Sequence, residues 1–193
     1  MDNISFKSRI RPAGFWEFAS QTRAFEPRQY VNYPWTVKES VISNKAITKN
    51  VFDCTVCGIT DGLKVLMMHI CPTIKINHDF SKIVAFIKDN INLQDSNLQG
   101  FLFGSVTNFQ DGMSGEIFGS FESFLKEHSI PYSKIRGSRD VSDVAYSSEK
   151  DEWLIRSNAR LRADINETGN GALNFLKENF DEVKISELDE VCW

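Results

Sequence analysis

VFDCTVCGITDGLKVLMMHICP, residues 51–72, is the stretch of this sequence that decides its fold. Residues 51–60 are rich in β-forming side chains and end at Asp61-Gly62, a strong turn signal. Residues 63–70 have the composition of a second strand, which a proline stops two residues later. The stretch therefore predicts a β-hairpin, and three of the four cysteines of the chain fall on it or at its end, together with one histidine.

Strand and helix signals mix along the rest of the chain. Apolar stripes predict helices that begin at Asp79 or Ser81, at residue 117 and at residue 171. Further strands are predicted at residues 100–106, 132–135, 141–146 and 153–156. This mixed order favours an α/β (α+β) fold, with a β-sandwich core flanked by helices, over a parallel doubly wound sheet.

The length of 193 residues fits one domain with extensions at both ends. Residues 1–45 are rich in aromatic side chains and interrupted by prolines, which predicts an irregular N-terminal arm packed on the domain. Residues 46–158 form the predicted domain itself. Residues 159–193 are predicted to contain a helix followed by an acidic tail from residue 181.

Composition excludes several classes of protein. The chain is 41% hydrophobic with 15 Phe and 4 Trp, which is far too apolar for a disordered protein. Its net charge of -4 argues against a nucleic-acid partner, which would select clustered Lys and Arg. The most apolar stretch, residues 65–71, is much shorter than the ~20 residues that span a bilayer. We therefore expect a protein folded in the cytoplasm, with no nucleic-acid and no membrane partner.

A thiol site needs a cysteine, a histidine that takes its proton, and a third group that orients the imidazole. The predicted turn brings Cys54 and His69 together as cross-strand neighbours if the two side chains share a face. Thr48, six residues before Cys54, can offer its hydroxyl or its carbonyl to the other imidazole nitrogen. These three residues are the candidate catalytic set.

The spacing Thr48-x5-Cys54, with Asp61 seven residues after the cysteine and His69 shortly before Pro72, resembles the chemoreceptor glutamine deamidases (CheD). It is also similar to the catalytic domains of deamidating bacterial toxins of the cytotoxic necrotizing factor and lethal-factor types. The resemblance covers about residues 46–158.

Several expectations follow from this resemblance. It implies a β-sandwich with flanking helices and a bacterial hydrolase that converts glutamine of a protein substrate to glutamate plus ammonia. Cys54 would be the nucleophile, His69 the base and Thr48 the orienting residue, with no cofactor and no metal. It also implies either a chemotaxis role in the cytoplasm or a toxin-like effector that enters a host cell without a cleavable signal peptide. A monomer is the default oligomeric state.

Two departures keep alternatives open. Phe52-Asp53 stands where the family usually has Gly-Ser, which is compatible with a catalytically inactive interaction module of the same fold. Asp53-Cys54 is also similar to the laccase-domain proteins, whose Cys and His ligands can hold zinc. The alternative zinc ligands are Cys54, Cys57, His69 and Cys71. Residues three apart on a strand point to opposite faces, which argues against this set; the cysteines can also be ordinary buried core thiols.

Overall fold

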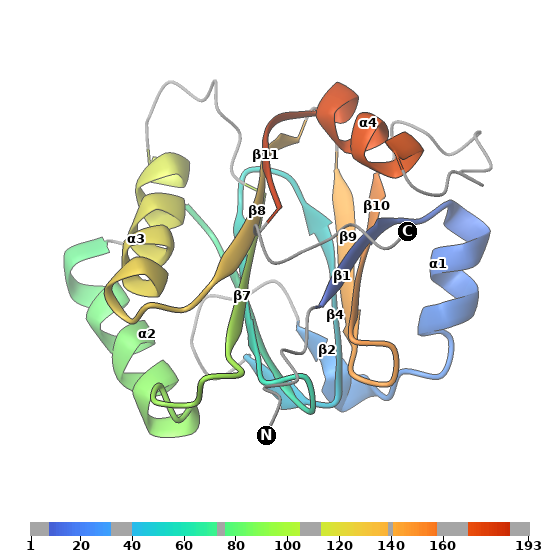
Figure 1. Cartoon of the computed structure of the whole chain (residues 1–193). Coiled ribbons are helices and arrows are strands. Elements are labelled where there is room, and N and C mark those ends of the chain that lie inside the picture. The colour runs from blue at the N-terminus through green and yellow to red at the C-terminus, as the bar shows by residue number, and fades with distance from the viewer. Residues whose placement is uncertain are drawn as a thin grey trace.

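A computed structural model describes residues 8–31, 40–72, 76–104, 113–138, 141–157 and 170–185. Within these residues the protein is an α+β structure with two mixed β-sheets, of five and six strands, and four α-helices (Figure 1). The α+β fold class predicted from the sequence is confirmed.

The first sheet has a central antiparallel part and parallel outer strands. β9 pairs antiparallel with both β10 and β4, whereas β1 pairs parallel with β10 and β2 parallel with β4. In spatial order the strands are β1 (Arg9–Pro12), β10 (Glu152–Ser157), β9 (Ser142–Ser147), β4 (Lys45–Val51) and β2 (Tyr30–Val31).

The second sheet contains the predicted hairpin. Its strands are, in order, β11 (Phe180–Lys184), β8 (Tyr132–Ser138), β7 (Gln99–Gly104), β5 (Thr55–Thr60), β6 (Val65–Ile70) and β3 (Val41–Ser43). The β5–β6 pair is antiparallel, and Asp61 Oδ1 accepts the N–H groups of Leu63 and Lys64 in the connecting loop. Gly62 there has a φ of 86°, a conformation that glycine adopts without strain. The hairpin prediction is confirmed, although its first strand begins at Thr55.

The two sheets face each other across a shared apolar core. This core takes residues such as Tyr146 and Trp153 from the first sheet and Phe101 and Phe103 from the second. The rings of Phe101 and Trp153 stack with centroids 4.5 Å apart. Trp153 also fills the space above Gly58, where a Cβ atom would lie 2.1 Å from its Cη2 atom. Gly58 is therefore the position that allows the two sheets to pack closely.

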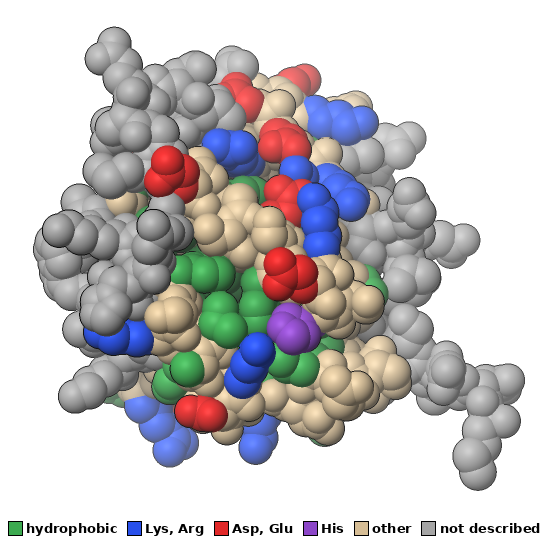
Figure 2. Space-filling view, turned by 90° about the vertical axis from the view of Figure 1, so that its left-hand side faces the viewer, with side chains coloured by type: hydrophobic (Ala, Val, Ile, Leu, Met, Phe, Trp, Pro, Cys, Tyr) green, Lys and Arg blue, Asp and Glu red, His purple; other side chains and the backbone are tan. Residues whose placement is uncertain are grey.

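Helices α2 (Ile76–Asn90) and α3 (Met113–Glu127) cover the other face of the second sheet (Figure 1). Ile83 and Ile87 of α2 lie in this second core, which confirms the predicted apolar stripe, although the helix begins before the predicted caps. Figure 2 views this side of the molecule and shows hydrophobic side chains gathered in the middle of the face, bordered by charged ones.

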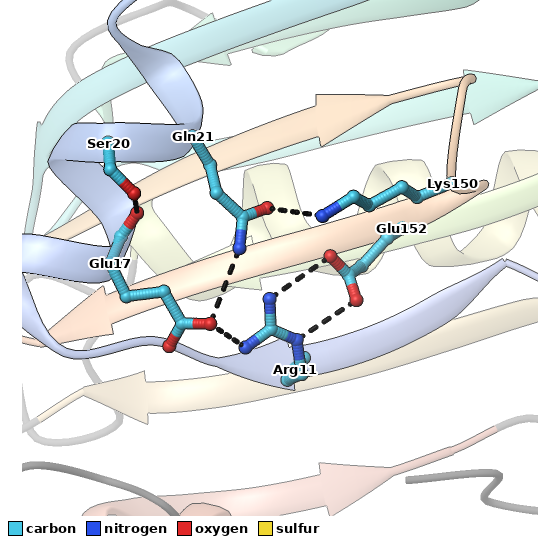
Figure 3. Close-up of polar contacts among 6 residues, drawn as sticks. All are labelled: Arg11, Glu17, Ser20, Gln21, Lys150 and Glu152. Carbon is cyan, nitrogen blue, oxygen red and sulfur yellow. Dashed lines mark hydrogen bonds and ion pairs between the residues drawn. The ribbon is translucent and has the colours of Figure 1, made fainter.

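Helix α1 (Phe15–Thr22) covers the outer face of the first sheet through a polar network (Figure 3). The Arg11 guanidinium donates to both carboxylate oxygens of Glu152, at 2.9 and 3.3 Å, and pairs with Glu17 of α1. Gln21 then bridges Glu17 and Lys150. The network ties α1 to the β1–β10 edge. The last helix, α4 (Asn170–Asn179), leads directly into β11.

Within the described residues, both ends of the chain contain more regular structure than the sequence predicts. The N-terminal segment is not irregular, because it contributes β1, α1, a 3-10 turn η1 (Pro27–Gln29) and β2, and then β3, so that it joins both sheets. Its aromatic side chains do anchor it, since Phe18 and Phe25 are buried against Ile47. The predicted acidic tail begins with a strand, β11, while residues 186–193 lie outside the described residues. No described helix is both long and apolar enough to cross a membrane.

Candidate functional site

The three predicted catalytic residues lie in the interior, at the end of the hairpin opposite its turn. Cys54 immediately precedes β5, His69 lies on β6, and Thr48 lies on β4 of the facing sheet. Their residues are 1%, 0% and 0% exposed, respectively. Thr48 therefore reaches His69 from the first sheet, whereas Cys54 and His69 belong to the second.

Cys54 and His69 share a face of the second sheet. His69 is directly opposite Val56 in the β5–β6 ladder, and Cys54 is two residues before Val56. Side chains two residues apart on a strand point the same way, and both Cys54 and Val56 belong to the core between the sheets. Cys54 thus lies on the same side of the second sheet as His69, one diagonal step beyond the pair that His69 makes with Val56.

The hydroxyl of Thr48 decides which nitrogen of His69 carries the hydrogen. Thr48 Oγ1 lies 2.7 Å from His69 Nδ1 and also donates to the carbonyl oxygen of Val31 at 3.1 Å. A hydroxyl has a single hydrogen, and a carbonyl oxygen can only accept. That hydrogen is therefore used on Val31, and His69 Nδ1 must be the donor to Thr48 Oγ1. The neutral imidazole then keeps its lone pair on Nε2, the form that a general base requires.

Local structure around Thr48 holds this bond in place. Thr48 is opposite Val31 in the parallel β2–β4 pair, which brings the Val31 carbonyl within reach. The register of β4 shifts directly after Thr48, and Asn50 in this bulge has a φ of 60°. Asn50 N–H donates to the buried carboxylate of Asp143 at 3.0 Å, which supports the bulge. The chain then turns from β4 toward Cys54.

Burial lowers the pKa of His69 to about 4, because the interior disfavours the charged imidazolium, while the negative charge of Asp53 partly opposes this effect. At neutral pH the side chain is accordingly uncharged. Together with the Nδ1–H tautomer, this makes His69 a proton acceptor in the resting protein.

The loop that carries Cys54 is held from two sides. The Cys54 thiol donates to Asp53 Oδ1 at 3.5 Å, and the hydroxyl of Ser114, in the first turn of α3, donates to the Asp53 carbonyl at 2.5 Å. Gly104, with a φ of 104°, packs against the same loop, and a Cβ atom there would lie 2.2 Å from the Cys54 carbonyl oxygen. The positive end of the α3 dipole therefore lies beside the loop of the thiol, where it favours negative charge.

Sequence reasoning missed the supporting residues of this site. Val31 and Ser114 carry no signal in the sequence, since one acts through its backbone and the other is a common helix-start residue. Gly104 falls within the strand predicted at residues 100–106, and nothing in the sequence marks its contact with the Cys54 loop. Asp53 was noted as a departure from a family pattern, and its contact with the thiol emerges only in the structure.

The four alternative zinc ligands do not come together. Cys57 faces the helices and lies in the second core, whereas Cys54 and Cys71 lie in the core between the sheets. Burial raises the pKa of the Cys57 thiol, which keeps it protonated. Within the described part of the chain, no group of three or more His, Cys, Asp or Glu side chains is placed to hold a metal ion. Cys192 lies outside the described residues.

The chain matches no protein-family model and no curated protein in sequence, so a functional proposal rests on the geometry of this site.

Proposed function

We propose that this protein is a cysteine-dependent glutamine deamidase that acts on another protein, built on the β-sandwich of the CheD and deamidating-toxin type. The observation that carries the proposal is the pair of hydrogen bonds made by the Thr48 hydroxyl, which leave His69 Nε2 as a base on the face of the sheet that it shares with Cys54. A threonine orienting a histidine beside a cysteine is the arrangement that the resemblance implies.

The reaction follows from thiol chemistry. His69 Nε2 takes the proton of Cys54, and the thiolate attacks the carboxamide carbon of a glutamine side chain. Backbone N–H groups around Cys54, together with the positive end of the α3 dipole, stabilise the negative oxygen of the tetrahedral intermediate. The carbon–nitrogen bond breaks, and His69 returns the proton to the leaving ammonia. Water, deprotonated by His69, then cleaves the thioester, which releases glutamate and restores the thiol.

The carboxylate of Asp53 interacts with both Cys54 and His69. It accepts the thiol hydrogen of Cys54, and its charge favours the protonated form of His69. The imidazolium exists only after Cys54 has given up its proton, so Asp53 stabilises the charged state formed during the reaction. In this proposal Asp53 is a positioning residue, and its side chain replaces the small serine of the family pattern.

Two measurements test the proposal, beginning with the thiol. We expect iodoacetamide to label Cys54 faster than Cys57, as quantified by mass spectrometry of each cysteine peptide between pH 5 and pH 9. Thr48→Val, which keeps the shape but removes both hydrogen bonds, should slow the labelling of Cys54 by about tenfold, because one buried hydrogen bond contributes about 1.4 kcal/mol to holding the imidazole in place. Thr60→Val is a matched control, since Thr60 bonds Tyr146 and Lys64 at the other end of the hairpin.

The second measurement is ammonia release from a glutamine-containing probe, such as casein, with the probe's gain in acidic residues followed by mass spectrometry. The activity should be lost in Cys54→Ser and kept in Cys57→Ser. A Cys54 that reacts no faster than Cys57, with a rate unaffected by Thr48→Val, would contradict the catalytic proposal.

Burial of the site favours a second candidate function, a protein-interaction module that keeps the fold without the activity. Both Cys54 and His69 are almost fully buried, so a glutamine side chain reaches the thiol only if the surrounding chain moves. In this case Cys54 is inert, and Cys54→Ser leaves binding of a partner protein unchanged. Partner capture with the wild type and Cys54→Ser, compared with the labelling experiment, separates the two functions.

A further inference from the structure

Cys71 occupies a position that the proposed mechanism does not use. The β5–β6 ladder ends with the pair Thr55 and Ile70, and Cys54 and Cys71 are the residues that adjoin this last pair, so that continuing the register by one residue would place them opposite each other. Both cysteines belong to the core between the sheets and are 1% and 3% exposed. The last ladder pair therefore brings a second thiol to the same end of the hairpin, and to the same core, as the proposed nucleophile.

We propose that Cys54 and Cys71 are an oxidation site, at which a hydroperoxide converts the two thiols into an intramolecular disulfide. This inference deepens the proposed function, because it takes Cys54 as the reactive thiol. Formation of the disulfide would remove the nucleophile, and a thiol reductant would restore it, so that the site would be active only when reduced.

The spacing of an antiparallel ladder suits such a bond. Directly opposite residues have Cα atoms about 4.5 or 5.5 Å apart, depending on the hydrogen-bonding pattern of the pair. Both values lie within the range of about 4.4–6.8 Å that disulfides span. Side chains of opposite residues also point to the same side of the sheet. Cys57 meets neither condition, because it is opposite Met68 and faces the helices.

The disulfide forms in two steps, through a sulfenic acid on Cys54. The Cys54 sulfur, as thiolate, attacks the outer oxygen of a hydroperoxide, the O–O bond breaks, and the products are a Cys54 sulfenic acid and an alcohol or water. The Cys71 thiolate then attacks the Cys54 sulfur, which forms the S–S bond and releases hydroxide, with the displaced proton completing a molecule of water. The two cysteines lose two electrons in all, and the hydroperoxide gains them. His69, two residues from Cys71 on the same face, is placed to accept either proton.

The experiment uses the full chain with Cys192→Ser, so that only the three described cysteines remain. This protein is compared with variants in which Cys57 or Cys71 is also replaced by serine. Each variant is treated with a small excess of hydrogen peroxide, blocked with N-ethylmaleimide and digested for mass spectrometry. We expect a peptide pair linked through Cys54 and Cys71, a loss of free Cys54 of about tenfold, and full recovery after dithiothreitol. Cys57→Ser should behave in the same way.

Cys71→Ser should give no linked peptide, and its Cys54 should instead proceed to the irreversible sulfinic acid. The inference is overturned if Cys54 is oxidised equally in Cys57→Ser and Cys71→Ser without a linked peptide, or if no cysteine is oxidised. The measurements distinguish failure of the redox proposal from failure of the deamidase proposal. Fast labelling of Cys54 and ammonia release without a disulfide overturn only the redox pair, whereas a disulfide without ammonia release overturns only the deamidase.

Discussion

Acidification should weaken the folded protein through His69. The pKa of this buried imidazole is about 4, against an ordinary value of 6.5, so between these two values the unfolded chain binds a proton that the folded chain does not. Lowering the pH through this window therefore favours the unfolded state, and above pH 6.5 the effect vanishes. The full difference corresponds to about 3 kcal/mol, of which about 2 kcal/mol is lost between pH 7 and pH 5.

Urea unfolding at pH 7 and pH 5 measures this loss. The wild type should lose about 2 kcal/mol more between the two pH values than His69→Gln, which cannot titrate. Most carboxyl groups of the unfolded chain titrate below pH 5 and are common to both proteins, so their contribution cancels in the difference. His128→Gln is the control, because His128 packs beside Phe124 at the edge of the helix layer, away from the site.

An equal pH dependence in the wild type and His69→Gln would refute this reasoning. It would mean that the imidazole is not held neutral in the folded state, and that water or a negative charge reaches it. His69 would then not be an uncharged base in the resting protein either, since its neutral state depends on the same burial.

Three glycine substitutions, one of them a control, test the packing that positions the site. Gly104→Ala should cost at least about 2 kcal/mol in urea unfolding and slow the labelling of Cys54, because its positive φ and the Cys54 carbonyl leave no room for a Cβ atom. Gly119→Ala in α3, where a Cβ atom meets nothing, should instead add about 0.5–1 kcal/mol, and equal effects at both positions would contradict the assignment. Gly58→Ala should lower the free energy of unfolding by about 1–3 kcal/mol, because the added Cβ atom overlaps Trp153. In a double-mutant cycle, Trp153→Phe should recover at least about 0.5 kcal/mol of that loss. If the two effects are strictly additive, Trp153 is not the obstacle.

The hairpin was predictable because it depends on short-range rules. The Asp61-Gly62 turn signal places the loop, and the alternation of side chains along a strand sets Cys57 on the face opposite Cys54. This conclusion needs only a count of residues within a short stretch. Whether His69 shares the face of Cys54 stayed open in the sequence, because it depends on the register of β5 against β6.

The N-terminal and C-terminal strands were not predictable, because they are short and exist through distant pairing. β1 has four residues and pairs with β10, about 140 positions away, while β2 has only two. β11 is acidic and lies at the edge of the second sheet, where its Glu182 forms an ion pair with Lys134 of β8. Its charge pattern is typical of a solvated tail, so it does not indicate a strand. Periodicity over so few residues carries no reliable signal.

The sequence by itself determined the candidate residue types, the hairpin on or beside which Cys54 and His69 lie, and the alternation that separates Cys57 from Cys54, because local backbone geometry decides these properties. Only the tertiary structure decided that Thr48 meets His69 from the opposite sheet and that the Val31 carbonyl uses the hydroxyl hydrogen. It also decided that the imidazole is buried and uncharged. Protonation and tautomer depend on the groups that surround a side chain in space, and here those groups come from two different sheets.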